Sequence, residues 1–208
     1  MFAIHGVLAS FGGDEAGGIS LVGTSSGGGT TNLPAGLQEN DHVVVQIASD
    51  DYDINSVPGW TTIQTRLSSA RGVLVAKRMG STPDTIIVVD ARCAVVSMAF
   101  RGVDITTAED VTHQSLSGFG SPNPPAITPI TNGCAIVISA SLDDKEAAGS
   151  MVAPTGFGDL VVSDEGSQNA TAIMAWQSQT TASMINPEAF VGSSDDNWTT
   201  TQALRPQQ

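Results

Sequence analysis

Residues 42–51 read HVVVQIASDD, and residues 134–144 read CAIVISASLDD. Each stretch is an apolar run of strand length that ends at a pair of aspartates. Runs that are apolar at nearly every position are typical of strands covered on both faces, in the middle of a sheet or beneath loops. The two stretches therefore predict a β-rich fold, and their likeness predicts that the fold contains one unit twice.

The similarity continues beyond these runs. Each copy has a turn motif with glycine and an aromatic residue, then a further strand-like run, then a closing motif with arginine. General similarity among β-rich sequences is the alternative explanation, but the spacing drifts slowly, as loop insertions would make it. We expect half-repeats at residues 42–104 and 134–206. The corresponding pairs are VPGW (57–60) with APTGF (153–157), GVLVAKR (72–78) with TAIMAWQ (171–177), and AFRG (99–102) with ALRP (203–206).

The composition predicts one globular β-domain. The chain has 208 residues, of which 40% are hydrophobic and only 14% are charged, and Gly, Ser and Thr supply much of the remaining surface. No window has helical periodicity with caps at both ends, apart from a possible helical turn near residues 107–110. The predicted fold is all-β: an antiparallel β-sandwich, jelly-roll-like, built from two similar halves. Strands are expected at residues 42–49, 61–67, 71–79, 84–90, 93–101, 134–142, 158–163, 170–178 and 198–205.

Two segments lie outside the half-repeats. Residues 1–41 are rich in glycine, with one short strand candidate at residues 19–22, and we expect them to act as an N-terminal attachment segment. Residues 42–208 are expected to form the sandwich. Within it, residues 121–129 carry four prolines, which favour an extended conformation and remove amide donors. We interpret this segment as the linker between the halves.

The net charge excludes some partners. The chain has 21 acidic and 8 basic residues, a formal charge of −13. Such a chain repels phosphate groups, so we expect binding neither to nucleic acid nor to anionic membrane surfaces. No apolar run has the length of a membrane span, and the first residues lack the pattern of a secretory signal. We expect a protein made in the cytoplasm.

Paired aspartates are the first candidates for a binding site. They end both apolar runs, and further acidic pairs occur at residues 164–165 and 195–196. Carboxylates grouped at strand ends could bind calcium, or could serve as acid and base in a glycosidase. The simpler interpretation is that aspartate favours turns and keeps strand ends soluble. The calcium candidates are Asp50, Asp51, Asp53, Asp143 and Asp144.

Other chemical motifs are weak. Ser25 lies in a G-x-S-x-G pattern at residues 23–27, but glycines follow where a nucleophile elbow needs a helix. The histidines at positions 5, 42 and 113 show no metal-ligand spacing. Cys93 and Cys134 each begin an apolar run and are expected to be free, buried thiols, although a disulfide between paired strands is the alternative. We therefore predict no catalytic residue, no metal and no cofactor.

Aromatic residues are expected to anchor the core. Trp60 and Phe157 occupy corresponding places in the two copies, which favours packing over sugar stacking. Phe100 and Leu204 hold corresponding places in the closing motifs. Trp198 is a further aromatic residue with polar neighbours, and exposed aromatics of that kind can stack on sugars.

Four short motifs carry a resemblance to a known class of proteins. They are VPGWT (57–61), AFRGVD (99–104), PAITP (125–129) and WTTTQALRP (198–206). With these motifs, residues 42–206 resemble β-rich structural proteins of tailed bacteriophages. The resemblance implies a virion component and supplies no catalytic residue.

The expected function follows from this resemblance. It implies a non-enzymatic structural protein, made in the host cytoplasm and located in the virion, most simply a capsid decoration or cement protein. The alternatives are a tail fibre or tail-tip component, or a carbohydrate-binding β-sandwich module for host attachment. The implied partners are other virion proteins, either the major capsid protein or tail proteins, together with further copies of the chain itself.

Overall fold

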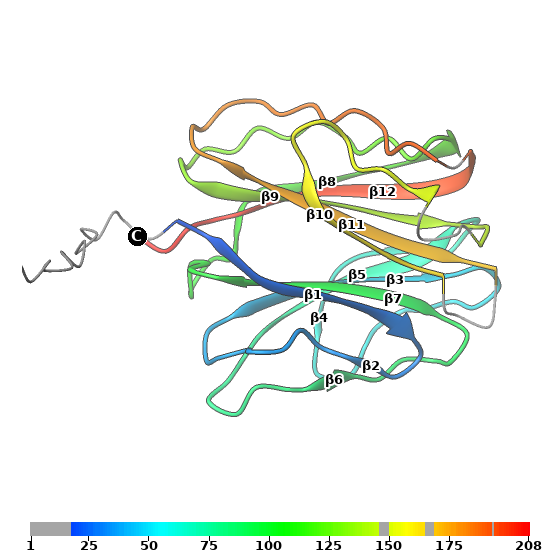
Figure 1. Cartoon of the computed structure of the whole chain (residues 1–208), viewed down its shortest axis with the longest axis horizontal. Helices are drawn as coiled ribbons and strands as arrows, with labels where there is room; N and C mark the ends of the chain where they lie inside the picture. The colour runs from blue at the N-terminus through cyan, green and yellow to red at the C-terminus, as the bar shows by residue number, and fades with distance from the viewer. Residues whose placement is uncertain (1–17, 146–149, 165–168, 193) are drawn as a thin grey trace, which may run out of the picture.

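Two five-stranded antiparallel sheets stack face to face and bury the main core between them (Figure 1). The structure is a computed structural model that describes residues 18–145, 150–164, 169–192 and 194–208, and these residues contain no α-helix. The antiparallel β-sandwich expected from the sequence is therefore confirmed.

Each sheet has a central strand that is buried on both faces. The first sheet has the order β1 (Ser20–Gly28), β7 (Ala94–Arg101), β3 (His42–Ser49), β5 (Arg71–Arg78) and β4 (Thr61–Arg66). The second has the order β8 (Glu109–Gly120), β12 (Asp195–Leu204), β9 (Cys134–Leu142), β11 (Thr171–Gln179) and β10 (Gly158–Ser163). A small third sheet pairs β2 (Thr31–Asn32) with β6 (Ile86–Ile87).

The two large sheets have the same topology. When the five strands of each half are numbered along the chain, both sheets have the order 1-5-2-4-3. The registers agree as well, because Gln46 of β3 lies between Val96 and Leu74, and Ser139 of β9 lies between Thr200 and Met174. Each of these two central residues comes four positions before an Asp-Asp pair. The two similar halves predicted from the sequence are thus confirmed as two equivalent sheets.

The β-bulges follow the same equivalence. The pairing of β4 with β5 shifts between residues 62 and 64, and the pairing of β10 with β11 shifts between residues 158 and 161. These are the third and fourth strands of their halves, so an irregularity that bends an edge strand recurs at the same place in both sheets.

The boundaries of the halves differ from those expected. β1 belongs to the first sheet, so the sandwich begins at Ser20 instead of residue 42. β8 belongs to the second sheet, so the chain passes between the sheets at residues 102–108, and the Pro-rich segment 121–129 connects β8 with β9 inside one half. Each half keeps to its own sheet, whereas in a jelly roll the strands alternate between two sheets. The expected jelly-roll connectivity is therefore not what the chain adopts.

Two smaller expectations also differ. The segment near residues 107–110 is no helical turn. Asp104 accepts hydrogen bonds from the amides of Thr106 and Thr107 at 2.8 Å each, which turns the chain directly into β8. The strand expected at residues 84–90 is reduced to the two residues of β6.

Loops form an additional layer on the outer face of each sheet (Figure 1). The outer face of the first sheet packs under residues of the loops near Leu33, Ile54 and Ile87. The outer face of the second sheet packs under Met151 and Phe190. These covers explain why the central strands are apolar at nearly every position, since neither face meets water.

A buried polar cluster interrupts the core between the sheets. The Gln46 side chain donates to Ser141 Oγ at 2.8 Å and accepts from Ser139 Oγ at 2.8 Å, and Ser139 Oγ lies 2.6 Å from Thr200 Oγ1. All four side chains are buried. Because a buried polar group without a partner is costly, these bonds favour one alignment of the two sheets. Gly72 provides the space, because its Cα lies next to Gln46 and Ser141.

Candidate functional site

The repeated aspartate pairs meet at one end of the sandwich. Asp50 follows β3, Asp143 follows β9, and Asp195 begins β12, which pairs with β9. Burial raises the pKa of Asp50 to about 6, helped by its hydrogen bond with Asp143 and by the charge of that carboxylate. Burial also raises the pKa of Asp195, to which the charges of Asp144 and Asp143 contribute. The repeat has thus placed like charges side by side.

These carboxylates are not arranged as a metal site. Asp53 is bound to Arg71 Nε at 2.9 Å, and Asp143 Oδ1 accepts from the Ala70 amide at 3.3 Å. Asp51 and Asp144 are exposed. Within the described part of the chain, no group of three or more His, Cys, Asp or Glu side chains could hold a metal ion. The geometry gives the calcium hypothesis no ligand set.

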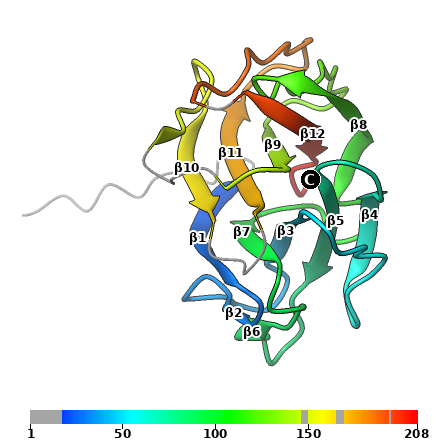
Figure 2. The same cartoon turned by 90° about the vertical axis from the view of Figure 1, so that its right-hand side faces the viewer.

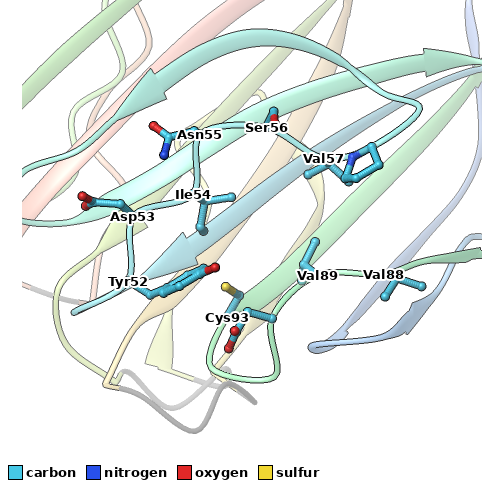
Figure 3. Close-up of a pocket in the computed structure, with 11 residues that line it drawn as sticks. Tyr52, Asp53, Ile54, Asn55, Ser56, Val57, Val88, Val89 and Cys93 are labelled. Atoms are coloured by element: carbon cyan, nitrogen blue, oxygen red, sulfur yellow. The ribbon is translucent and has the colours of Figure 1, made fainter.

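A pocket of about 430 Å³ lies beneath the loops on the outer face of the first sheet (Figure 3). The segments 52–58 and 88–90, together with Cys93, line it. Its charged groups are engaged, because Asp90 pairs with both Arg92 Nε (2.8 Å) and Nη2 (3.0 Å), and the Arg92 guanidinium stacks 4.0 Å from the Tyr52 ring centre. The pocket is therefore lined mainly by backbone, small polar and aliphatic groups.

The cysteine of the pocket is not an activated nucleophile. Burial raises the pKa of the Cys93 thiol to about 12, so the thiol stays protonated at neutral pH. The pKa of Cys134 is also raised to about 12, again chiefly by burial. Both cysteines are free. Cys93 directly precedes β7 of the first sheet and Cys134 begins β9 of the second, and the two belong to different apolar clusters. The expectation of free, buried thiols is confirmed.

The histidines share no site. His42 is buried, and within the described residues neither of its ring nitrogens has a protein hydrogen-bond partner. Burial lowers its pKa to about 3, assisted by the charge of Arg78, so the ring is neutral. His113 lies at the seam between β8 and β4, with ring nitrogens 3.3 Å from Glu109 Oε1 and 3.3 Å from Gln64 Oε1. His5 lies outside the described residues.

Ser25 of the G-x-S-x-G pattern lies in the middle of β1. Its hydroxyl donates to the carbonyl of Asn32 at 2.7 Å and lies 2.7 Å from Ser97 Oγ. The chain continues as a strand through Gly28, so the strand-to-helix turn of a nucleophile elbow is not formed. The serine connects neighbouring segments of the first half.

Trp60 and Phe157 are equivalent in structure. Each closes a turn in which its amide donates to the residue three positions earlier, Val57 or Pro154, and in which the preceding glycine has φ near +80° or +90°. Both side chains are half-buried, less than expected for core anchors, and they pack on the outer faces of different sheets. Phe100 and Leu204 are fully buried between the sheets.

Trp60, Phe157 and Trp198 do not form one surface for sugar stacking. Trp198 is 3% exposed and lies in the central core, while Trp60 and Phe157 are separated by both sheets. An aromatic surface suited to stacking on a sugar needs neighbouring exposed rings. The aromatic side chain with the greatest exposure among the described large hydrophobic residues is Phe119 of β8, at 78%.

Two arginine–aspartate pairs were not expected from the sequence. Arg101 makes a two-bond pair with Asp41 at 2.8 and 2.9 Å, and Arg205 Nε lies 3.1 Å from Asp110 Oδ1. Both aspartates are buried, and each also accepts backbone amides from the loop that precedes the second strand of its half. The AFRG and ALRP motifs mark the two arginines as equivalent residues. They do not identify the partner aspartates, because these come from different places in the two halves.

The comparisons with known proteins add no relative. No family model, no curated protein and no solved structure matches the chain. Among the described residues there is no helix of the length and hydrophobicity needed to cross a membrane.

Proposed function

We propose that the chain is a non-enzymatic structural protein of a tailed-phage virion, and most simply a capsid decoration protein. The supporting observation is the structural use of the motifs that carry the resemblance. VPGWT forms the turn before β4, AFRGVD ends β7 with the Arg101–Asp41 pair, and WTTTQALRP is most of β12 with the Arg205–Asp110 pair. These residues build and join the sheets, as scaffold motifs do.

The nature of the surface agrees with this role. Decoration requires docking on other subunits without a high cost of removing charges from water. Large hydrophobic side chains such as Leu116, Phe119 and Ile130 are exposed. We propose other virion proteins, and further copies of the chain, as the partners of these surfaces.

Copy number per particle tests the proposed function. Quantitative mass spectrometry of purified particles is expected to find the protein at hundreds of copies per virion. A few to dozens of copies would place it on the tail and favour the fibre or tip alternative. Its absence from particles would overturn the proposal.

A truncation tests the attachment role of the N-terminal segment. Because β1 and β2 belong to the sandwich, that role falls on residues 1–17, which lie outside the described residues. Deleting residues 1–17 is expected to leave the thermal melt unchanged and to reduce incorporation into particles. Incorporation at full copy number would show that attachment uses the sandwich itself.

A further inference from the structure

β8 is an edge strand with one open side. It is twelve residues long, pairs with β12 on one side, and ends the second sheet (Figure 2). In an antiparallel sheet, alternate residues of an edge strand direct their N–H and C=O groups away from the neighbouring strand. Within the described residues, no backbone hydrogen bond joins residues 111–119 to any segment other than β12.

The sequence of β8 does not protect this edge. Edge strands are usually protected by lysine, proline, bulges or short length. Residues 111–120 read VTHQSLSGFG and contain no Lys, Arg, Asp, Glu or Pro, in a chain with a net charge of −13. The bulge against β12 lies near residues 111–114, so the part from residue 115 onward is regular. The open edge is therefore long, and residues 111–120 contribute no Lys, Arg, Asp or Glu side chain to it.

Both faces of this strand also meet solvent. Residues 114–119 are all exposed, with Phe119 at 78% and Leu116 at 50%. Positions 116 and 119 differ by an odd number, so the two side chains lie on opposite faces of the strand. A strand added alongside β8 would cover part of each side chain, in addition to pairing the backbone.

The equivalent strand of the first half is covered within the chain. β1 is also the first strand and the edge of its sheet, and it is equally poor in charge. The Gly27 carbonyl of β1 accepts from Ser163 Oγ of β10 at 2.7 Å, and Ser25 binds the Asn32 carbonyl. Along residues 114–119 the corresponding contact is a side-chain bond, from Arg66 Nη1 of β4 to Ser117 Oγ at 2.7 Å, and it does not pair with the backbone of β8.

We propose that β8 pairs antiparallel with β8 of a second copy, joining two second sheets across a two-fold axis. An antiparallel pair of identical strands closes on itself, so the contact makes a dimer and not an open chain. Two copies with a charge of −13 repel over most approaches, and the uncharged stretch lets them meet without opposed carboxylates. A basic partner would gain more from the acidic end near Asp50 than from this strand. The pairing does not depend on a virion role.

The oligomeric state of the purified full chain tests this pairing. Sedimentation velocity across about 1–200 µM is expected to show a monomer–dimer equilibrium, as small β-mediated interfaces give. Leu116→Lys and Phe119→Lys each place a charge on an exposed side chain near the axis. Each is expected to weaken dimerisation by about tenfold or more while leaving the melting temperature unchanged. The matched control is Val88→Lys, which charges a side chain that is 58% exposed on the first half and should leave the dimer intact.

A cross-link tests the register. In an antiparallel pair centred near residue 115, Ser115→Cys places two thiols close together, so mild oxidation should yield a covalent dimer. Ser56→Cys, an exposed position elsewhere, should not cross-link. A chain that is monomeric throughout the concentration range overturns the proposal, even if another protein binds β8. A dimer that survives both lysine variants, or that Ser115→Cys fails to trap, shows that another surface forms it. None of these outcomes depends on particle incorporation, which tests the virion role separately.

Discussion

Gly72 is the residue on which the contact between the sheets depends most closely. A Cβ atom at this position would overlap Ser141 Oγ and would lie 2.7 Å from the carbonyl oxygen of Ile47 and 3.1 Å from Gln46 Nε2. One of these neighbours is backbone and the other two belong to the buried polar cluster. Glycine is therefore required at this position because neighbouring atoms lie too close for a side chain, and not because of its backbone conformation.

Gly72→Ala is expected to destabilise the fold by about 3 kcal/mol or more, because the methyl group has to displace backbone and break buried hydrogen bonds. Urea unfolding of the purified protein measures this change. Gly80→Ala is the matched control, since nothing lies within 4 Å of a Cβ there, and it should change the free energy of unfolding by less than about 0.5 kcal/mol. Equal effects of the two substitutions would show that Gly72 is not tightly packed.

At the scale of elements, the sequence predicted most strands but not the first strand of either half. The edge strands β4 and β10, like the inner strands named next, are found within one residue of their expected bounds. Five inner strands are found within one residue of their expected bounds: β3, β5, β7, β9 and β11. Their continuous apolar runs are typical of strands that are buried on both faces. β1 and β8 were missed or shortened. Their Ser, Thr and Gly residues meet solvent and carry no alternation, so the pairing partner alone makes them strands.

The site was predicted only in part, for a similar reason. The aspartate pairs could be read as strand ends, but which pairs meet depends on how two distant strands stack. The partners of Arg101 and Arg205 are 60 and 95 residues away and do not follow the repeat. Nothing in the sequence around either arginine predicts which aspartate it pairs with.

The meeting of β3 and β9 gives a pH dependence. The Asp50 pKa is about 6 in the folded chain against an ordinary value of 3.8, so the folded protein holds this proton more tightly than the unfolded one. Its stabilising contribution is present below pH 3.8 and is lost as the pH rises to about 6. Asp50→Asn is therefore expected to raise stability at pH 7 by up to about 1 kcal/mol, after allowance for solvent screening, and to change little at pH 4.

Melting curves of the wild type and Asp50→Asn at pH 4, 5, 6 and 7 measure this effect. The lowered pKa of His42 acts in the opposite direction, since its neutral form is favoured as the pH rises from about 3 to 6.5, but it is common to both proteins and cancels in their difference. Asp51→Asn removes the same charge from an exposed neighbour, whose charge contributes less to the raised pKa of Asp50 than that of Asp143 does, so it is expected to give a smaller pH-dependent difference. A difference that is constant across this pH range would contradict the carboxyl pairing.

At the scale of the whole molecule, each half depends on the other. The central core takes Val44, Phe100 and Met98 from the first sheet and Val137, Met174 and Leu204 from the second. The ends of the halves also pair directly, because Asp104 N donates to the Arg205 carbonyl at 2.9 Å and Gln207 N donates to the Gly102 carbonyl at 2.7 Å. Neither half has a second layer of its own that could cover this inner face.

Fragments 1–104 and 105–208 are therefore expected to remain unfolded when purified separately and to form the sandwich when mixed. The cut lies beside Ile105, which is 53% exposed, so it removes little packing. Circular dichroism and a cooperative melt of the mixture measure recovery of the fold. A cooperative melt of either fragment alone would show that a half is an independent domain.

The contact between Gln46 and Ser139 shows that equivalent positions of the two halves can hold different residue types. These residues hold equivalent places in the two halves and hydrogen-bond to each other, so the pseudo-symmetry axis passes between them. In a symmetric pair of separate identical chains, that position could face only its own kind. Glutamine against glutamine would overfill the space, and serine against serine would leave a void. Covalent fusion removes this restriction and allows a long amide to be matched with a short hydroxyl.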